Sequence, residues 1–482
     1  MKHDSIYTLI ASVVVIGLLT GCSVGPDFTS PARPDVAVYT TRPLPSNTAN
    51  APTALGESQH FKEVRWINPQ WWQELGSVRL NTLVQDALQA SPTLARAQAT
   101  LRQAQELYAA RAGSSLYPQV DANLGAQRQR FIPSSSGLTG DAREFSLYNS
   151  GVGINYTLDL AGGNQRALEA LAARVDYQRY QLAGSRLNLV ANIVTTAVDQ
   201  ANIYGQIQAT KDILQMQEEQ LELTKERVRL GQAAPDDVLA LQTPVEQTRA
   251  TIPLLYTQLQ QTEHLLAVLG GRAPGAGCLP SFTLAEFTLP TDLPLIVPSE
   301  LIHSRPDIQA AEALLHVANA EYGMAIAKLY PQVNLSADLG LLALTTDTFF
   351  SGSSTVWGLV GQLTQPLFKP GLPAEKRAAL AGFDAAAANY QNVVLEALRN
   401  VADVLRALEN NALRLAALAA GNMAAQESFN SMQRRYELGA ASYVQLLIAQ
   451  QQVQQTQINL IEAQARRLVD SAALYQAMGG DI

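Results

Sequence analysis

The residues best suited to chemistry, two cysteines and five histidines, are too scattered to form a catalytic or metal-binding site. No two histidines fall four residues apart, the spacing that would place both on one metal ion from one helix. No glycine-rich phosphate loop follows a strand, and no Gly-x-Ser-x-Gly elbow joins a predicted strand to a helix. We therefore expect no enzyme activity, no metal and no cofactor. The histidines are His3, His60, His264, His303 and His316.

One of the two cysteines has a recognisable environment. A short apolar run ends at Leu19-Thr20-Gly21-Cys22, and a run of this length is typical of the core of a signal peptide, here residues 1–21. The tetrapeptide resembles the bacterial lipobox, whose cysteine becomes the acylated first residue; an uncleaved anchor is the alternative. A lipid on Cys22 would attach the chain to a membrane. Cys278 then has no partner for a disulfide.

Composition and net charge exclude several classes of protein. The chain has 482 residues, of which 47% are hydrophobic and 16% are charged, so it can bury large surfaces and is neither disordered nor a polytopic helical membrane protein. Its net charge of −8 argues against nucleic acid as a partner, because phosphate binding requires basic patches.

Two very long helices must position whatever site exists. Residues 164–230 contain no proline, and as one helix they would measure on the order of 100 Å at 1.5 Å per residue. Residues 374–438 form a second proline-free run, and both runs end in Leu-Gly, a typical helix C-terminus. Helices of this length indicate a coiled coil, a helical repeat or a spanning scaffold.

The two helices belong to a tandem repeat. Tyr-Pro-Gln-Val occurs at 117–120 and again at 330–333, and each copy ends in Gly-Gly. An N-terminal arm, 22–79, precedes the repeats, and Trp66, Trp71 and Trp72 are expected to pin it onto a helical surface. The first repeat, 80–271, is predicted as a helix, a hairpin at 118–160, a helix at 164–230, a turn and a helix at 235–269. A proline-rich linker, 272–304, leads to the second, 305–482, with a helix, a hairpin at 331–368, a helix at 374–438, a turn and a helix at 442–477.

Each hairpin alternates apolar and polar residues over strands long enough to cross a membrane. Four strands cannot close a barrel, and an open edge cannot remain in lipid, so several copies must associate. Two copies would give eight strands around a filled interior, whereas three would give twelve and begin to leave a lumen. The predicted fold class is an α+β membrane protein in which helices continue the barrel as a hollow cylinder.

Several motifs together resemble the outer membrane factor family of TolC-like channels, and most closely its NodT-type efflux lipoproteins, over essentially the whole mature chain. They are the lipobox, Gly25-Pro26-Asp27-Phe28, Trp71-Trp72, Ser304-Arg305-Pro306-Asp307, the paired Tyr-Pro elements and the Leu-Gly turns. The resemblance implies a homotrimer with a twelve-stranded outer-membrane β-barrel, four strands per chain, a periplasmic α-helical barrel and an equatorial collar.

The resemblance also implies a function and a location. The chain would be the passive outer-membrane conduit of a tripartite efflux pump in a Gram-negative bacterium, exporting drugs and small toxic compounds. Its partners would be outer-membrane lipid, a periplasmic adaptor and an inner-membrane pump of the RND, ABC or MFS type. The exit channel of a type I secretion system is one alternative. A structural, adaptor-type coiled-coil lipoprotein is an alternative from another class, which the four alternating strands disfavour.

The two turns acquire roles from the same resemblance. They would dock the adaptor's helical hairpins at the periplasmic tip, in addition to the helix capping that glycine provides. These turns are Arg229-Leu230-Gly231-Gln232 and Glu437-Leu438-Gly439-Ala440.

A gate is expected beside the turns, where the family often carries acidic residues. This sequence has Gln445 and Ile448 at the matching positions. One hypothesis is an apolar constriction around Leu447 and Ile448 that closes partly by dewetting. The other is a charged lock between neighbouring turns, although acids at a helix start also complement its dipole. The lock would join Asp236 or Asp237 to Arg434 or Arg435.

Overall fold

The computed structural model describes residues 23–32, 35–132, 139, 141–277 and 280–480. The predicted signal peptide, Cys22 and Cys278 lie outside the described residues. The chain divides into two compact units. The strand unit comprises the described residues within Met1–Pro31, Thr100–Gln178 and Ala310–Tyr390, and the turn unit comprises those within Ala32–Ala99, Arg179–Gln309 and Gln391–Ile482.

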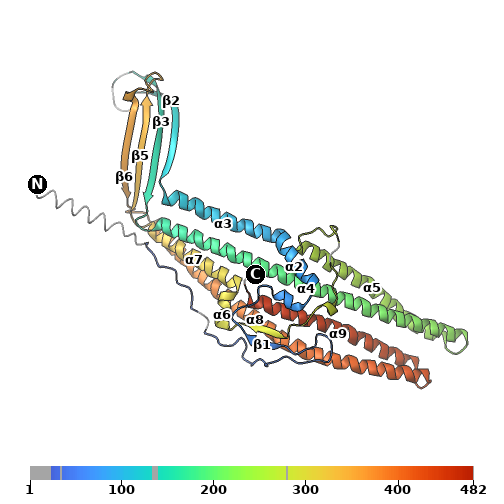
Figure 1. Ribbon diagram of the computed structural model, residues 1–482. Coiled ribbons are helices and arrows are strands. Elements are labelled where there is room, and N and C mark those ends of the chain that lie inside the picture. Colours follow the sequence, from blue (N-terminus) through green and yellow to red (C-terminus); the bar gives the residue numbers. More distant parts are fainter. Residues whose placement is uncertain (1–22, 33–34, 133–138, 140, 278–279, 481–482) are drawn as a thin grey trace. The chain divides into compact units, whose positions relative to one another are not determined.

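The strand unit contains one antiparallel sheet of four long strands in the order β2-β3-β5-β6 (Figure 1). The strands are β2 (Gln119–Phe131), β3 (Arg143–Leu158), β5 (Gln332–Ala343) and β6 (Thr355–Thr364). Each hairpin is formed by one repeat, and the contact between β3 and β5 joins the two repeats. The outer edges of β2 and β6 have no strand partner among the described residues.

One face of this sheet is apolar and exposed. A row of paired residues crosses all four strands, with Ala122 opposite Val152, Val152 opposite Leu339, and Leu339 opposite Trp357. Leu124 and Leu359 lie on the same face and are also exposed. Alternation with period two produces this arrangement, because successive side chains of a strand point to opposite faces.

Two helices of 67 residues each dominate the rest of the chain, α4 (Gly163–Arg229) and α8 (Gly371–Glu437). Helix α4 begins where the Asp159 carboxylate accepts a hydrogen bond from the Gln165 amide at 2.8 Å, which satisfies one of the free N–H groups of its first turn. The predicted bounds were 164–230 and 374–438.

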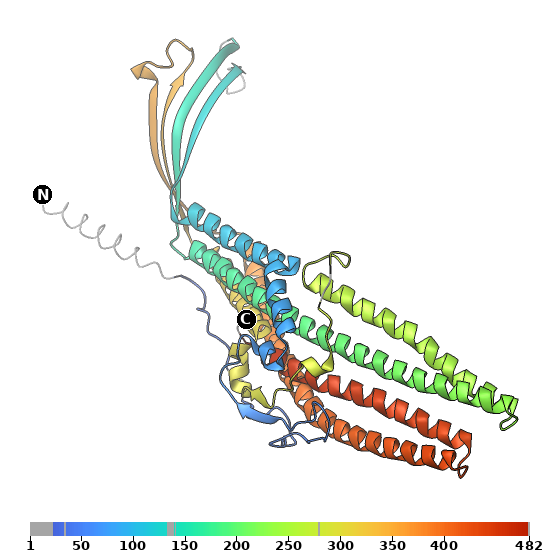
Figure 2. The ribbon, with the colours of Figure 1, turned by 45° about the vertical axis from the view of Figure 1, so that its right-hand side comes forward.

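Shorter helices flank the long ones. In the turn unit, α5 (Pro235–Leu269) follows α4 and α9 (Tyr443–Met478) follows α8, each after a tight turn (Figures 1 and 2). Helix α5 continues through Pro244 and Pro253. Among the described residues, no helix combines the length and apolar character needed to cross a bilayer. The remaining helices are α2 (Val78–Ala90), α3 (Pro92–Leu116), α5 (Pro235–Leu269), α6 (Pro298–Ser304), α7 (Pro306–Ala327) and α9 (Tyr443–Met478).

The arm and the linker meet in the turn unit. Strand β1 (His60–Glu63) from the arm pairs in parallel with β4 (Asp292–Leu295) from the linker, and His60 lies opposite Asp292. The region 272–304 therefore contains ordered elements as well as connections. Two short helical turns complete this part, η1 (Trp71–Leu75) and η3 (Leu284–Glu286).

Two of the three tryptophans that were expected to pin the arm do so. Trp71 is 1% exposed and stacks on Tyr475 of α9 with ring centroids 5.1 Å apart. Trp72 is also buried, and its indole N–H donates to Asn81 at 3.1 Å. The prediction for Trp66 was wrong, because this side chain is 87% exposed.

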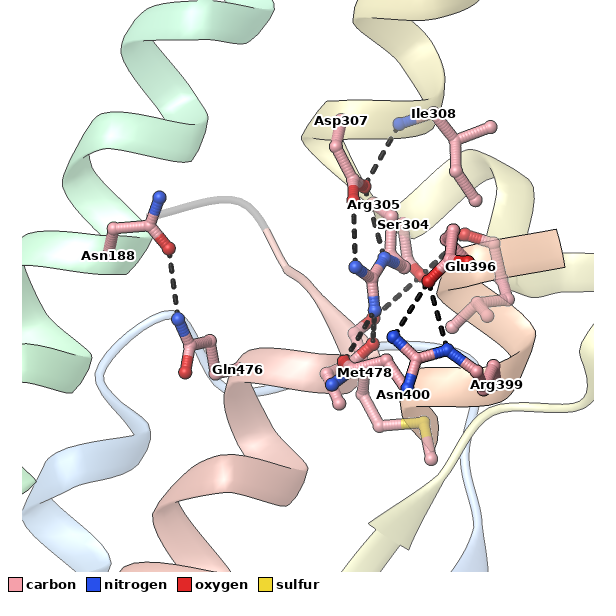
Figure 3. A network of polar contacts seen from close by, with 12 residues as sticks. Asn188, Ser304, Arg305, Asp307, Ile308, Glu396, Arg399, Asn400, Gln476 and Met478 are labelled. Carbon is pink, nitrogen blue, oxygen red and sulfur yellow. Dashed lines mark hydrogen bonds and ion pairs between the residues drawn. The ribbon is translucent and has the colours of Figure 1, made fainter. Parts of the chain in front are cut away.

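The start of the second repeat binds the end of α9 (Figure 3). The Arg305 guanidinium donates to the Ala477 carbonyl at 2.7 Å, to Asn400 of α8 at 3.2 Å and to both oxygens of Asp307 at 3.0 and 2.7 Å. The Ser304 hydroxyl donates to the Met478 carbonyl at 2.8 Å. Carbonyls in the last turn of a helix lack partners within the helix, so a cation and a hydroxyl there stabilise its C-terminus.

Candidate docking and gating site

The two predicted docking turns have the same backbone geometry. Gly231 has φ +73° and Gly439 has φ +70°, a left-handed conformation that costs glycine little. The Gln232 amide donates to the Arg227 carbonyl at 2.8 Å, and the Ala440 amide donates to the Arg435 carbonyl at 2.7 Å. These are the long hydrogen bonds of a Schellman motif, which satisfies carbonyls at a helix end.

Each turn presents a leucine to solvent. Leu230 is 55% exposed and Leu438 is 84% exposed. Arg229 forms an ion pair with Glu226 on its own helix. No ion pair or side-chain hydrogen bond within the described residues involves Glu437. The turns thus combine a fixed backbone with an accessible apolar side chain.

The acidic and basic residues of the hypothetical lock are not joined within one chain. Asp237 accepts a hydrogen bond from the Ala234 amide at 3.1 Å, so it caps the start of α5. Asp236, Arg434 and Arg435 are exposed, and no ion pair of the described residues involves them. Within one chain, Asp237 therefore acts as a helix cap. A charged lock between chains remains a prediction.

The residues of the hypothetical apolar gate have different exposures. Ile448 is exposed, Leu447 is half-buried, and their neighbour Leu446 is buried. Gln445 forms a capping box with Ser442: the Ser442 amide donates to the Gln445 side chain at 2.9 Å, and the Gln445 amide donates to the Ser442 hydroxyl at 3.3 Å. Gln445 therefore caps the start of α9, and Ile448 is the exposed member of the predicted apolar pair.

An aromatic and cationic cluster beside the turns was not predicted from the sequence. Arg227 of α4 donates to the Tyr436 hydroxyl of α8 at 2.6 Å and lies over its ring. The Tyr443 ring meets Tyr436 edge-on at 5.8 Å. Tyr443 also packs against an apolar cluster of Leu221, Leu241 and Val245. These contacts join the helical hairpin α4–α5 of the first repeat to the helical hairpin α8–α9 of the second.

Tyr443 is in an unusual electrostatic position. Its hydroxyl is buried and has no hydrogen-bond partner among the described residues. Burial, together with the neighbouring Tyr436, raises the pKa of the Tyr443 hydroxyl. The sequence signal was an aromatic residue directly after the Ser442 cap, but its distant partners on α4 and α5 could not be identified from spacing.

The arm is clamped in the strand unit immediately after the predicted lipidation site. The Val24 amide donates to the Ala161 carbonyl at 3.0 Å. A Cβ at Gly162, which has φ +72°, would lie 2.5 Å from the Cα of Ser23. The residue that follows Cys22 is therefore held against the connection between β3 and α4.

A buried arginine organises this clamp. Arg166 of α4 donates to the carbonyls of Val24 and Gly25 at 3.3 and 3.2 Å, and to the carboxylates of Asp27 and Glu169 at 2.7 Å each. Burial alone would lower the pKa of Arg166, but the ion pairs with Glu169 and Asp27 outweigh it and raise the pKa. The cation is thus firmly charged.

Helix α7 supplies the other side of the clamp. His316 stacks on Phe28 at 4.2 Å, and its Nε2 lies 2.8 Å from the Glu169 carboxylate. Asn319 donates to the Pro26 carbonyl at 3.0 Å. Gly-Pro-Asp-Phe, noted in the sequence only as a motif, is therefore a segment bound by α4 and α7.

No metal site accompanies these clusters: within the described part of the chain, histidine, cysteine, aspartate and glutamate side chains do not gather in threes as ligands.

Comparisons with known proteins agree with this architecture. The family described as "Outer membrane efflux protein" matches residues 83–272 and 297–480. The toluene efflux pump outer membrane protein TtgC of Pseudomonas putida is 29% identical over 479 residues, 98% of this chain and 95% of the relative. The pyoverdine export outer membrane protein OpmQ of Pseudomonas aeruginosa is 29% identical over 417 residues, 85% of this chain and 87% of the relative.

A solved structure is similar over almost its full length. The outer-membrane channel OprN superposes with a TM-score of 0.85 at 27% identity, covering 95% of this chain and 99% of the other.

Proposed function

The chain belongs to the outer membrane efflux protein family, as its motifs indicated, and we propose that it forms the outer-membrane duct of a tripartite efflux pump. Three copies would supply twelve strands to one barrel, and their long helices would continue the barrel as a tunnel through the periplasm. The duct is passive, and an inner-membrane pump supplies the energy. The family is one of transport channels, so no catalytic step is proposed.

The observation that carries the proposal is the four-stranded sheet. Its strands are 10 to 16 residues long, its outer face is apolar, and both of its edges are open. In lipid every backbone polar group requires a partner, so such a sheet is stable only when copies close it into a barrel. Twelve strands are enough to leave a lumen.

The clamp around Arg166 supports a lipid anchor on Cys22. It fixes Ser23 at the connection between β3 and α4, which is the end of the sheet. A lipid on the preceding cysteine would therefore enter the membrane near the level at which the strands leave it. Acylation and a membrane-spanning barrel then hold the chain in one membrane.

The turns support a docking and closing role. Leu230 and Leu438 are accessible anchors for the helical hairpins of a periplasmic adaptor. The contact of Arg227 with Tyr436, and the packing of Tyr443, hold the two hairpins of one chain together. Closure between chains would then involve Ile448 in an apolar constriction, or Asp236 with an arginine of a neighbouring turn.

The cargo is not fixed by this chain. Two relatives that are equally similar to this protein, at 29% identity each, are named for different cargoes. One is named for toluene efflux and the other for pyoverdine export. Small toxic compounds are the proposed class, and selection among them belongs to the inner-membrane pump. The same duct could serve a type I secretion system, whose export of a polypeptide in place of small compounds would identify that alternative.

A direct test uses the full-length acylated chain in mild detergent and in planar bilayers. Light scattering should give the mass of three chains, and the protein should conduct ions after insertion into a bilayer. A monomer without ion current would overturn the proposal. A Cys22→Ser variant should still form the trimer once it is inserted, since the barrel and not the lipid holds the copies together.

A further inference from the structure

We propose that an acyl chain of the lipid on Cys22 lies in an apolar groove on the sheet of the same chain, close to the end of β3 that leads into α4. This inference rests on the proposed function, because it assumes that the sheet faces lipid and that Cys22 is acylated. It goes further by assigning the lipid a binding site on the protein, whereas an anchor as such requires only the bilayer.

The groove combines small residues with larger apolar side chains around them. Its volume is about 450 Å³, which is within the range of sites that bind small organic molecules. Ala337 and Gly361 occupy little space, so they leave a hollow in a face that otherwise carries bulky side chains. The larger residues that surround them are Ile154, Tyr156, Leu335 and Leu359. A groove of this size and character suits a hydrocarbon chain.

Strand register places these residues on the exposed apolar face of the sheet. Ala337 is two residues from Leu339, which belongs to the exposed apolar row, and residues two apart on a strand point to the same face. In a membrane-spanning barrel this apolar face is the one in contact with lipid. The groove residues form two neighbouring rows across β3, β5 and β6, which are Ile154-Ala337-Leu359 and Tyr156-Leu335-Gly361.

The clamp brings the start of the arm to the same end of the sheet. Five residues after Tyr156, the Ala161 carbonyl accepts a hydrogen bond from the Val24 amide at 3.0 Å. Five residues of extended chain span at most about 18 Å, and the turn that follows β3 shortens this path. A bilayer core about 30 Å thick contains two layers of acyl chains, so one chain spans about 15 Å. A lipid on Cys22, the residue before Ser23, can therefore reach the groove.

A second apolar hollow lies towards the opposite end of the same face. Its lining includes Ala126 and Tyr148 of the sheet and Phe350 of the connection between β5 and β6. Tyr148 precedes Tyr156 by eight residues on β3, which corresponds to about 26 Å at about 3.3 Å per residue. A chain tethered beside Ser23 cannot span this additional distance. Phospholipid, which is not tethered, can enter both hollows, and this difference separates the two possible occupants.

A photoreactive acyl chain can locate the lipid. The full-length protein is produced in cells fed with a fatty acid that carries a diazirine near its methyl end, so that the Cys22 lipid and the phospholipids both contain the probe. Outer membranes are irradiated, the protein is purified and digested, and mass spectrometry identifies each crosslinked peptide. A crosslink to the N-terminal lipopeptide differs in mass from a phospholipid adduct. Bilayer conductance of the same preparation is recorded to verify assembly.

Variants that fill a hollow provide matched comparisons. Ala337→Phe places a ring in the groove, and Ala126→Phe places the same ring in the far hollow. Gly361→Leu fills the groove from another strand and guards against a folding defect in the first variant. A Cβ at Gly361 would lie 3.5 Å from the nearest atom of Leu335, an ordinary van der Waals contact, so the backbone tolerates this change. All three substitutions keep the face apolar.

In the unsubstituted protein, the lipopeptide should crosslink to the groove and not to the far hollow. Ala337→Phe and Gly361→Leu should each lower the yield of this crosslink by about tenfold, the factor expected when contact with about two methylene groups is lost, and Ala126→Phe should leave it unchanged.

Three results would overturn the inference. They are phospholipid adducts in the groove without the lipopeptide, equal lipopeptide crosslinking at the two hollows, and an N-terminal peptide that carries no lipid. Conducting trimers in any of these cases would leave the proposed duct standing. Monomers without current would instead reject the proposed function, and the inference with it.

Discussion

Replacing Tyr443 by phenylalanine should strengthen the contact between the two helical hairpins. The Tyr443 hydroxyl is buried without a hydrogen-bond partner among the described residues, and its ring packs on Leu241 and Val245. A buried hydroxyl without a partner costs about 1 to 3 kcal/mol. Removing the oxygen while the ring remains should therefore stabilise this contact by about that amount, and Tyr443→Ala should weaken it by leaving a cavity.

Hydrogen exchange measures the effect where it arises. Amides of α4, α5, α8 and α9 near the turns exchange through local opening, and a gain of about 1 to 3 kcal/mol slows exchange by about 5- to 150-fold. The conductance of the trimer should fall or stay constant in Tyr443→Phe and should rise in Tyr443→Ala.

Tyr475→Phe provides a matched control with the opposite sign. The Tyr475 hydroxyl is hydrogen-bonded to the Glu74 carboxylate, so the same chemical change removes a charge-assisted bond and should destabilise the protein by about 1.5 to 3 kcal/mol. Faster exchange in Tyr443→Phe would refute the reasoning, because it would mean that the Tyr443 hydroxyl has an acceptor, supplied by another copy.

Three further changes test the gate and the clamp. Asp236→Ala combined with Asp237→Ala should raise the conductance of the isolated trimer, and unchanged conductance in a planar bilayer would count against a charged lock. Arg166→Met should free the arm for proteolysis, because it removes the hydrogen bonds to the Val24 and Gly25 carbonyls and leaves the partly buried Glu169 without its cation, a loss of about 1.5 to 3 kcal/mol for the charge-assisted bond. Arg174→Met, which breaks an exposed pair worth about 0 to 1 kcal/mol, should not. Burial would raise the pKa of Glu169, but hydrogen bonds from Arg166 and a histidine outweigh it and hold the pKa below 4.5. The clamp should therefore keep its stability above pH 4.5 and lose it as pH falls through the lowered pKa, a loss that Glu169→Gln should abolish in protease-protection assays.

Elements with a local cause could be predicted from the sequence. Alternation with period two located four strands, and two proline-free runs that each end at a Leu-Gly pair located the long helices, whose ends differ from prediction by one to three residues. These signals suffice because backbone preferences and side-chain period are properties of neighbouring residues. Helix α5, beginning at Pro235, matched its expected bounds of 235–269 for the same reason.

Contacts between distant segments could not be predicted in this way. His316 was one of five scattered histidines in the sequence, yet it stacks on Phe28, almost three hundred residues away. The linker was predicted only as a proline-rich connection between the repeats, but Asp292–Leu295 becomes a strand when the arm supplies a parallel partner. Trp66 shows the converse error, since its aromatic character gave no indication that it would remain in solvent.

The two helix-end turns carry a consequence for how such a molecule can evolve. Their backbones are held by the same Schellman hydrogen bonds, while Arg229-Leu230-Gly231-Gln232 and Glu437-Leu438-Gly439-Ala440 differ in charge. After an ancestral duplication, the glycine and the leucine could stay fixed by geometry while the flanking side chains diverged. A chimera that exchanges the two tetrapeptides should therefore fold normally, yet each turn would present the charge that belongs to the other.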